Sequence, residues 1–168
     1  MKKDWQEQLP LNHIRDIKPV SGGDVNEAFK VTTEDDVYFL LVQRNRDKSF
    51  YAAEIAGLNA FEEAGVTAPH VIDSGEINGD AFLILSYLDE GTTGSQRELG
   101  QLVAKMHSQQ QSDGKFGFDL PHEGGDISFD NTWSDSWIEI FVERRMDHLR
   151  DELMGKGLWN DEDNKVYE

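Results

Sequence analysis

The stretch PVSGGDVNEAFKV, residues 19 to 31, alternates apolar and polar side chains around the adjacent glycines Gly22 and Gly23. An alternation with a period of two predicts β-strands, and the glycine pair predicts a hairpin turn between them. Two interpretations of this hairpin are open. It is an ordinary turn, or it is a phosphate cover whose backbone N–H groups come close to the ligand because glycine has no Cβ atom.

The composition narrows the classes of partner. The chain has 168 residues, of which 33 are acidic and 16 basic, giving a net charge of −17. This charge repels nucleic acids and anionic membranes, so neither is expected as a partner. The absence of cysteine excludes disulfides and zinc–thiolate sites and agrees with a cytoplasmic protein. The run AFLIL is too short to span a bilayer, and no apolar segment of a secretory signal follows the first residues.

The residues up to about 90 predict an α+β arrangement. A short helix over residues 5–9, three strand patterns, a helix over residues 48–64 and two further strand patterns follow one another. Short connections make neighbouring strands antiparallel, and Asn78-Gly79 is a strong hairpin signal. We therefore expect a five-stranded antiparallel sheet with one helix on one face, the helix ending at Gly65. The expected strands cover residues 13–20, 25–33, 37–43, 70–76 and 81–88.

The residues from 91 to 168 predict a helical domain. Ser95 and Glu98 form a capping box ahead of a first helix, a second helix is expected from Ser134, and Asn160 is the expected cap of a third. Helices this amphipathic need a partner surface, so we expect an incomplete helical lobe with exposed faces that allow self-association. The expected apolar face of the second helix consists of Ile138, Phe141, Val142, Met146, Leu149 and Leu153.

Glu54 gives the first indication of chemistry. The P-loop motif and a Gly-x-Gly-x-x-Gly motif between a strand and a helix are both absent from the sequence. A glycine-rich hairpin between antiparallel strands is instead typical of protein kinases. In these enzymes a glutamate on the next helix pairs with a strand-three lysine that holds the nucleotide phosphates. Glu54 lies at the matching edge of the expected helix, and the alternative is a rim glutamate that points to water.

Longer segments resemble one kinase family. PVSGGDVNEAF, VYFLLVQRN, FYAAEIAGLNAF and APHVIDSGEINGDAFLILSYLDEG resemble the N-lobe of the fructosamine kinases, also called ketosamine-3-kinases. LGQLVAKMHSQQQSDGKFGF and DNTWSDSWIEIFVERRMDHL resemble the start of their helical C-lobe. The resemblance implies a protein-kinase-like fold, with an N-lobe in residues 1–90 and part of a C-lobe in residues 91–168. It also implies transfer of the ATP γ-phosphoryl group, with Mg²⁺, to a sugar hydroxyl of glycated amines, free or protein-bound, which leads to deglycation.

The resemblance also implies a set of nucleotide contacts. Backbone groups of residues 86–88 are expected to read the adenine edge, while Asp24 and Asn26 are expected to orient the hairpin. The alternative for residues 86–88 is a domain linker that binds no ligand. The cofactor-binding candidates are Ser21, Gly22, Gly23, Asp24, Asn26, Leu41, Glu54, Ser86, Tyr87 and Leu88.

Two departures from the family pattern lower the expected activity to weak or none. Leu41 occupies the strand-three position of the ATP-binding lysine, and leucine has no group that donates to a phosphate. Loss of one such donor typically lowers the rate by about 10² to 10³. Lys30 and Arg44 are alternative donors, but a leucine that fills the core is the favoured interpretation. The family's His-Gly-Asp catalytic loop is not found in the 168 residues, so no catalytic residue and no metal ligand is assigned.

Other functions stay open. A degenerate kinase that acts as a binding or assembly module is the main alternative, and a kinase of the aminoglycoside phosphotransferase type is disfavoured by the segment Asn131–Arg145. The five histidines lack the spacing of metal ligands. The acidic loop with Glu123, Asp126 and Asp130 is either solvated or a cation site. The aromatic residues expected to pack, rather than to stack on a substrate, are Trp133, Trp137 and Phe141.

Overall fold

The computed structural model describes residues 3–20, 26–89, 91, 94–109, 113–124 and 127–167. The chain forms two compact units, Met1–Gln109 and Gln110–Glu168, and each is described by itself. These units are defined by where the chain contacts itself, so the expected lobe boundary at residue 90 stays a prediction. No helix in the described part of the chain combines the length and the apolar character needed to cross a bilayer.

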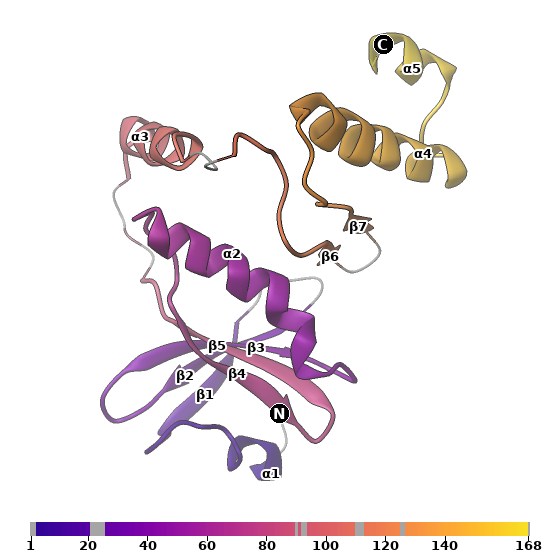
Figure 1. The fold of residues 1–168 in the computed structure, drawn as a ribbon. Coiled ribbons are helices and arrows are strands. Elements are labelled where there is room, and N and C mark those ends of the chain that lie inside the picture. The colour runs from indigo at the N-terminus through magenta and orange to yellow at the C-terminus, as the bar shows by residue number, and fades with distance from the viewer. Residues whose placement is uncertain are drawn as a thin grey trace. The chain divides into compact units, whose positions relative to one another are not determined.

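An antiparallel sheet of five strands organises the first unit (Figure 1). Its spatial order is β1-β2-β3-β5-β4, with a register in which Leu41 of β3 lies opposite Ala28 of β2 and Leu83 of β5. The predicted α+β fold with a five-stranded antiparallel sheet is therefore confirmed. The strands are β1 (Asp16–Pro19), β2 (Glu27–Thr32), β3 (Val37–Gln43), β4 (Val71–Ile77) and β5 (Asp80–Ser86).

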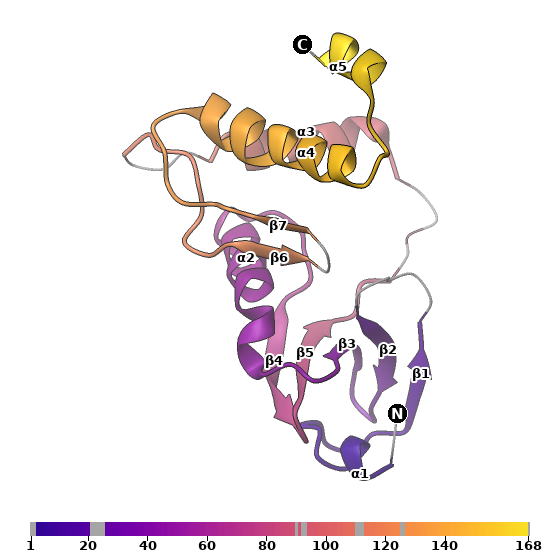
Figure 2. The same ribbon diagram turned by 90° about the vertical axis from the view of Figure 1, so that its right-hand side faces the viewer.

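One helix packs near each face of this sheet. The short helix α1 (Lys3–Gln6) begins earlier than predicted, and residues 7–10 form turns. The predicted helix over residues 48–64 starts as the 3₁₀ helix η1 (Lys48–Tyr51) and continues as α2 (Ala52–Glu63). Figure 2 shows α2 on one side of the sheet.

Turn residues with positive φ fix two chain reversals. Asn78 and Gly79 have φ values of 55° and 82°, as a type I′ turn between β4 and β5 requires, so the predicted hairpin is confirmed. Gly65 has a φ of 63° and follows α2 at the predicted position. The amide N–H of Val66 then donates to the carbonyl of Phe61, which closes the end of the helix.

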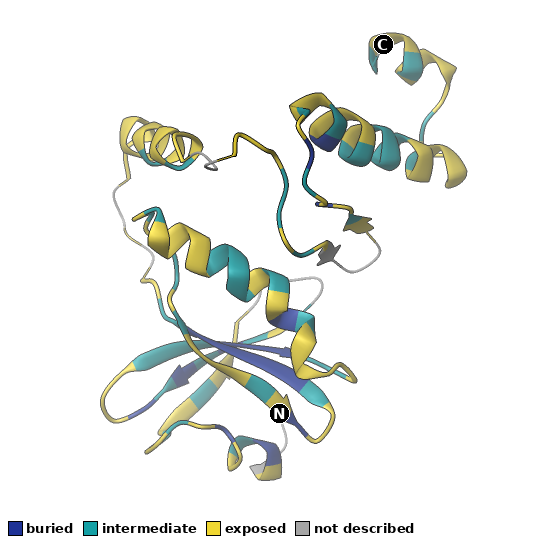
Figure 3. Cartoon of the chain, viewed as in Figure 1, coloured by how far each residue is buried: buried dark blue, intermediate teal, exposed yellow. Residues whose placement is uncertain are grey.

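Each face of the sheet contributes to a separate apolar core. Figure 3 shows the buried residues of the strands in dark blue. Leu40 and Val42 point to one core, where the Trp5 indole N–H donates to the carbonyl of Ile77 at 3.1 Å. Leu41 points to the other core because successive strand residues alternate between faces. The buried members of this helix-side core are Leu41, Tyr51, Ala81, Leu83 and Leu85, with Ile55 and Leu58 of α2 packed against them.

Helix α3 (Gln96–His107) is the last helix of the first unit. The Ser95 hydroxyl accepts a hydrogen bond from the backbone N–H of Glu98 at 3.1 Å, so the predicted cap is confirmed. No residue of α3 is buried, and Leu99 keeps 54% of its surface exposed. The Lys105 ammonium donates to the carbonyl of Gly65, which links α3 to the end of α2.

The second unit contains two short strands and a long helix. Strands β6 (His122–Gly124) and β7 (Ile127–Phe129) form a hairpin that the sequence did not predict. The helix includes the π-helical segment η2 (Glu139–Asp147) and continues as α4 (His148–Gly155). The predicted cap of α5 (Asp161–Tyr167) is confirmed, because the Asn160 side-chain oxygen accepts from the backbone N–H of Glu162 at 2.7 Å.

The predicted apolar face of the long helix is largely exposed. Ile138 is 64% exposed and Phe141 is 43% exposed, whereas Ile140 is 2% exposed. The π-helical segment brings residues five apart, such as Ile140 and Arg145, to the same side of the helix.

Leu40→Ala should destabilise the first unit by about 2 to 5 kcal/mol, since Leu40 has no exposed surface and its loss leaves a cavity. Urea unfolding followed by circular dichroism measures the change. Leu99→Ala is the matched control, because Leu99 is exposed on α3, and it should change the stability by less than about 0.5 kcal/mol. Equal effects of the two substitutions would contradict the core assignment.

Candidate functional site

The predicted nucleotide contacts that the structure describes all lie in the first unit. Ser21, Gly22, Gly23 and Asp24 lie outside the described residues. Asn26 directly precedes β2, Leu41 lies in β3, and Glu54 lies in the first turn of α2. Ser86 ends β5, and Tyr87 and Leu88 follow it.

Leu41 is part of the helix-side core. Its side chain is 8% exposed and belongs to the cluster that contains Tyr51 and Leu83. A lysine at this position would have to bring a charge into that cluster, and such a charge needs a partner. Leu41 therefore packs where the resemblance implies a phosphate-binding lysine.

Glu54 has no ion pair within the described part of the chain. The residue is exposed, but protein atoms around the carboxylate displace enough water to raise its pKa. Its negative charge also adds to the burial that raises the pKa of the Tyr51 hydroxyl. Glu54 thus lies near Tyr51 at the start of α2, without the cation that a kinase-like site provides.

The two alternative phosphate donors have partners of their own. Arg44 donates from Nε and Nη2 to the Glu27 carboxylate, each at 2.8 Å, and from Nη1 to Asp80 at 2.6 Å. These bonds lower the pKa of Glu27 and raise that of Arg44. The Lys30 ammonium lies 4.1 Å from the centre of the Tyr87 ring, which is a cation–π contact. Tyr87 belongs to residues 86–88, called the hinge below.

The segment after β5 is anchored to the strand next to it. The backbone N–H of Ser86 donates to the carbonyl of His70 at 2.9 Å, and the Ser86 hydroxyl accepts from the His70 N–H at 2.8 Å. Tyr87 is partly buried, while Leu88 is 50% exposed. The hinge is thus fixed at Ser86 and opens to solvent at Leu88.

Further residues on the helix side of the sheet were missed by the sequence analysis. Val20 bonds through its backbone N–H to the carbonyl of Ala28, and Ala28 lies opposite Leu41. Phe39 and Leu41 are two positions apart on β3, so they share a face. Val20 is 38% exposed, and Ala28 and Phe39 are partly buried, so they present apolar surface beside the hairpin. The period-two pattern around Leu41 was the signal that could have identified them.

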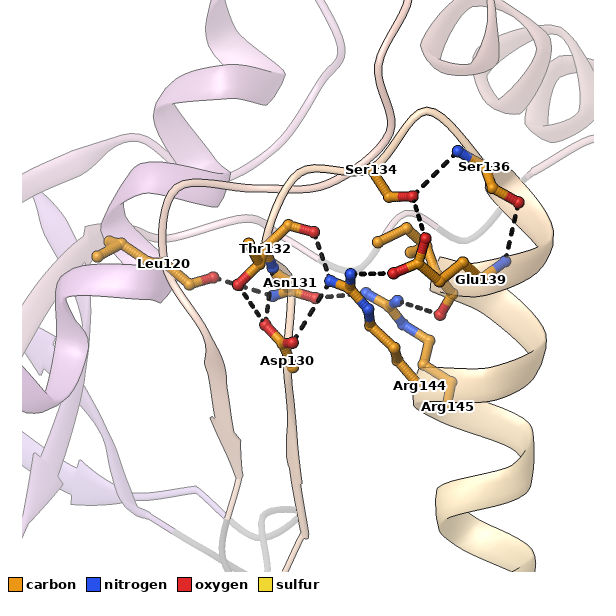
Figure 4. Close-up of polar contacts among 10 residues, drawn as sticks. Leu120, Asp130, Asn131, Thr132, Ser134, Ser136, Glu139, Arg144 and Arg145 are labelled. Carbon is orange, nitrogen blue, oxygen red and sulfur yellow. Dashed lines mark hydrogen bonds and ion pairs between the residues drawn. The ribbon is translucent and has the colours of Figure 1, made fainter.

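A polar cluster organises the second unit around Arg144, as Figure 4 shows. The Arg144 guanidinium donates to the carbonyl of Thr132 at 2.5 Å and pairs with Glu139 and with Asp130, the latter at 3.4 Å. Glu139 also accepts from the Ser134 hydroxyl at 2.5 Å, and these two partners hold its pKa below the usual range. Arg144 thereby connects the long helix to the loop that precedes it.

Asn131 extends the same cluster. It is 8% exposed, its side-chain N–H donates to the carbonyl of Leu120 at 2.9 Å, and its oxygen accepts from Arg145. Asp130 accepts from the hydroxyl and the amide of Thr132, which lowers its pKa. The acidic loop residue Asp130 is thus engaged with protein groups, and the described residues contain no cluster of three potential metal ligands.

Glu54→Gln should raise the thermal stability at pH 7 by a small amount. The pKa of Glu54 is higher in the folded than in the unfolded chain, so its ionisation destabilises the fold even though a helix dipole favours acids in the first turn. The penalty is absent below the unfolded-state pKa of about 4 and is complete above the folded-state value. Melting curves at pH 4 and pH 7 test this. Glu76→Gln is the control, and a gain that is equal at both pH values would contradict the assignment.

Asn131→Ala should weaken the second unit by about 1 to 3 kcal/mol, because it leaves the carbonyl of Leu120 and the Arg145 guanidinium without this partner. Native-state hydrogen exchange of peptides from residues 127–155 reports the local opening free energy. The neighbouring substitution Asp135→Ala removes an exposed side chain and should stay within about 0.5 kcal/mol. Unchanged exchange in Asn131→Ala would mean that the cluster does not hold the loop.

Comparison with known proteins adds to this geometry. The family model described as Fructosamine kinase matches residues 1–168. The chain is 66% identical over 168 residues to "Probable ketoamine kinase" of Staphylococcus aureus (strain NCTC 8325 / PS 47), covering 100% of this chain and 58% of that protein. It is 32% identical over 136 residues to "Protein-ribulosamine 3-kinase, chloroplastic" of Arabidopsis thaliana, covering 79% of this chain and 42% of that protein.

A solved structure has the same fold. A crystal structure from Haemophilus somnus 129PT that carries the name fructosamine-3-kinase superposes with a TM-score of 0.75 at 25% identity. The match covers 91% of this chain and 53% of that one, so the chain spans little more than half the length of such relatives. Together with the match along all 168 residues, these findings show that the chain belongs to the fructosamine kinase family.

Proposed function

We propose that the protein takes part in ATP-dependent phosphorylation of a sugar hydroxyl on glycated amines, and that the first unit forms the cover over the nucleotide. The observation that carries this proposal is one five-stranded sheet, with the paired strands β1 and β2 that flank the glycines, α2 and residues 86–88, in a chain of this family. The relatives' names, ketoamine kinase and protein-ribulosamine 3-kinase, support a ketosamine as the substrate class, free or protein-bound.

The described residues fit the base of ATP better than its phosphates. Val20, Ala28 and Phe39 offer apolar surface on which a purine ring can stack, with Leu88 at the hinge. On the same face, Leu41 donates nothing, and Lys30 lies over Tyr87. When bound, ATP supplies the phosphoryl group, and the hairpin backbone is the remaining candidate for contacts to its phosphates.

The described residues do not fit Mg²⁺ in the same way. They contain no group of three histidine, cysteine, aspartate or glutamate side chains that could hold a metal ion. We therefore assign no step of the reaction to a metal ion held by this chain. Mg²⁺ enters the proposal only as the usual companion of ATP in kinases.

We infer that phosphoryl transfer by the 168-residue chain is weak. The strand-three position holds Leu41 instead of a cation, and Glu54 forms no ion pair in the part of the chain that is described. The net charge of −17 supports small, locally bound partners rather than nucleic acid or a membrane surface. A cytoplasmic location belongs to the same proposal.

A second candidate is a non-catalytic binding or assembly module. It is favoured by the apolar side chains that the second unit leaves exposed, among which Trp137 and Phe141 stack at 5.3 Å between ring centres. Such surfaces are typical of association sites, including self-association. Nucleotide binding separates the two candidates, because the module needs none.

Leu41→Lys should increase the stabilisation by Mg-ATP. The introduced amine faces the side of Glu54 and adds a charged donor, so we expect at least about tenfold tighter nucleotide binding, although the basal melting temperature falls. Melting temperatures with and without Mg-ATP measure the difference between the wild type and the variant. Leu99→Lys adds the same charge on exposed α3 and should leave the nucleotide effect unchanged.

The outcomes separate the candidates. A nucleotide-dependent rise of equal size in the wild type and in Leu41→Lys would mean that the site works without the lysine, and that our account of Leu41 is wrong. No rise in either protein would favour the binding module over the kinase.

A further inference from the structure

The second strand of the glycine hairpin is held at its base by side chains from two directions. Asn26 and Glu27 are the first described residues after the hairpin. The Asn26 side-chain oxygen accepts a hydrogen bond from the Tyr51 hydroxyl at 3.1 Å. The Glu27 carboxylate accepts two hydrogen bonds from Arg44, each at 2.8 Å. Tyr51 lies at the start of α2 and Arg44 directly follows β3, so both elements are tied to the strand that leaves the hairpin.

Tyr51 is placed rigidly for this role. Its side chain is 1% exposed and packs in the helix-side core with Leu41. The Asp47 carboxylate caps the 3₁₀ helix by accepting from the backbone N–H of Ser49 at 2.8 Å. Phe50 contacts the Tyr51 ring edge to face, with ring centres 5.1 Å apart. The direction of the hydroxyl is therefore set by packing and capping before any ligand arrives.

The electrostatics fix the direction of the hydrogen bond. Burial, with the negative charge of Glu54, raises the pKa of Tyr51, so the hydroxyl keeps its proton at neutral pH. A protonated phenol in contact with an amide oxygen donates to it. The bond to Asn26 is accordingly neutral, and it persists across the physiological pH range.

A kinase site of the usual kind couples its helix to the nucleotide through the lysine–glutamate pair. In this chain Leu41 packs in the core and Glu54 has no ion-pair partner within the described residues, so that coupling is missing. We propose that Tyr51 is a positioning residue that couples α2 to the glycine hairpin through Asn26, in place of the strand-three ion pair. The coupling to nucleotide affinity rests on the proposed kinase function, whereas the anchoring of the hairpin does not.

This role predicts where the effect appears. Tyr51 acts on the position of the start of β2 and does not donate to the nucleotide, so its loss raises the dissociation constant for Mg-ATP. The amides at the start of β2 also exchange faster. A residue that only fills the core would change the stability of the whole first unit. Hydrogen exchange at the start of β2 would then change by the same factor as exchange in the remaining residues of the unit.

Tyr51→Phe tests the hydroxyl alone, because the ring that fills the core is retained. Hydrogen exchange of residues 26–29, the described start of the second hairpin strand, should become about fivefold faster, and the Mg-ATP dissociation constant should rise about fivefold, the effect expected for one net hydrogen bond. Tyr38→Phe is the matched control. It removes a hydroxyl from β3 on the opposite face of the same sheet and should change neither quantity.

Asn26→Ala and the double variant complete the test. If the two side chains act through one hydrogen bond, the double variant exchanges no faster than Tyr51→Phe alone. Additive effects, or unchanged hairpin exchange in Tyr51→Phe, would overturn the proposal. A wild type that binds no Mg-ATP contradicts the kinase function instead, and the exchange comparison still decides whether Tyr51 anchors the hairpin.

Discussion

Strand β3 is buried on both of its faces, and this double burial constrains the rest of the first unit. Leu40 and Val42 have no exposed surface in one core, while Leu41 is 8% exposed in the other. Packing in the core therefore restricts which side chain can occupy position 41, in addition to any requirement set by a ligand. A lysine there would lose hydration and would depend on Glu54 for compensation. Leucine avoids this loss of hydration, but its side chain cannot donate a hydrogen bond to a phosphate.

The absence of the strand-three charge changes how the neighbouring groups behave. Glu54 has a raised pKa because water is displaced around its carboxylate, and it forms no ion pair within the described residues. The ion pairs of this part of the sheet lie at the start of β2, where Arg44 pairs with both Glu27 and Asp80. Asp80 belongs to the β4–β5 hairpin, so one guanidinium ties together the ends of three strands. These charged groups thus hold together one end of the three inner strands of the sheet.

Local signals made much of the first unit predictable from sequence. The bounds of β3 and the turn at Asn78-Gly79 follow from alternation and from turn chemistry, which act over a few residues. Leu41 was singled out by the resemblance to a kinase family, and Glu54 by its place on the expected helix in the kinase pattern. The hydrogen bond between Tyr51 and Asn26 could not be predicted, because the two residues lie 25 positions apart. A hydrogen bond between distant segments has no local pattern.

The sequence did not reveal the contacts within the second unit, where polar groups decide which side of the helix faces the loop. Arg144 and Arg145 bind the segment from Asp130 to Thr132, and the π-helical geometry brings them to the side of Glu139 and Ile140. The apolar side chains of the predicted stripe, such as Ile138, consequently stay exposed. Charge-assisted hydrogen bonds to backbone carbonyls are directional, so they can fix a helix rotation that burial alone would set differently. The loop is then held by the helix while the aromatic pair of Trp137 and Phe141 remains available for contact with other surfaces.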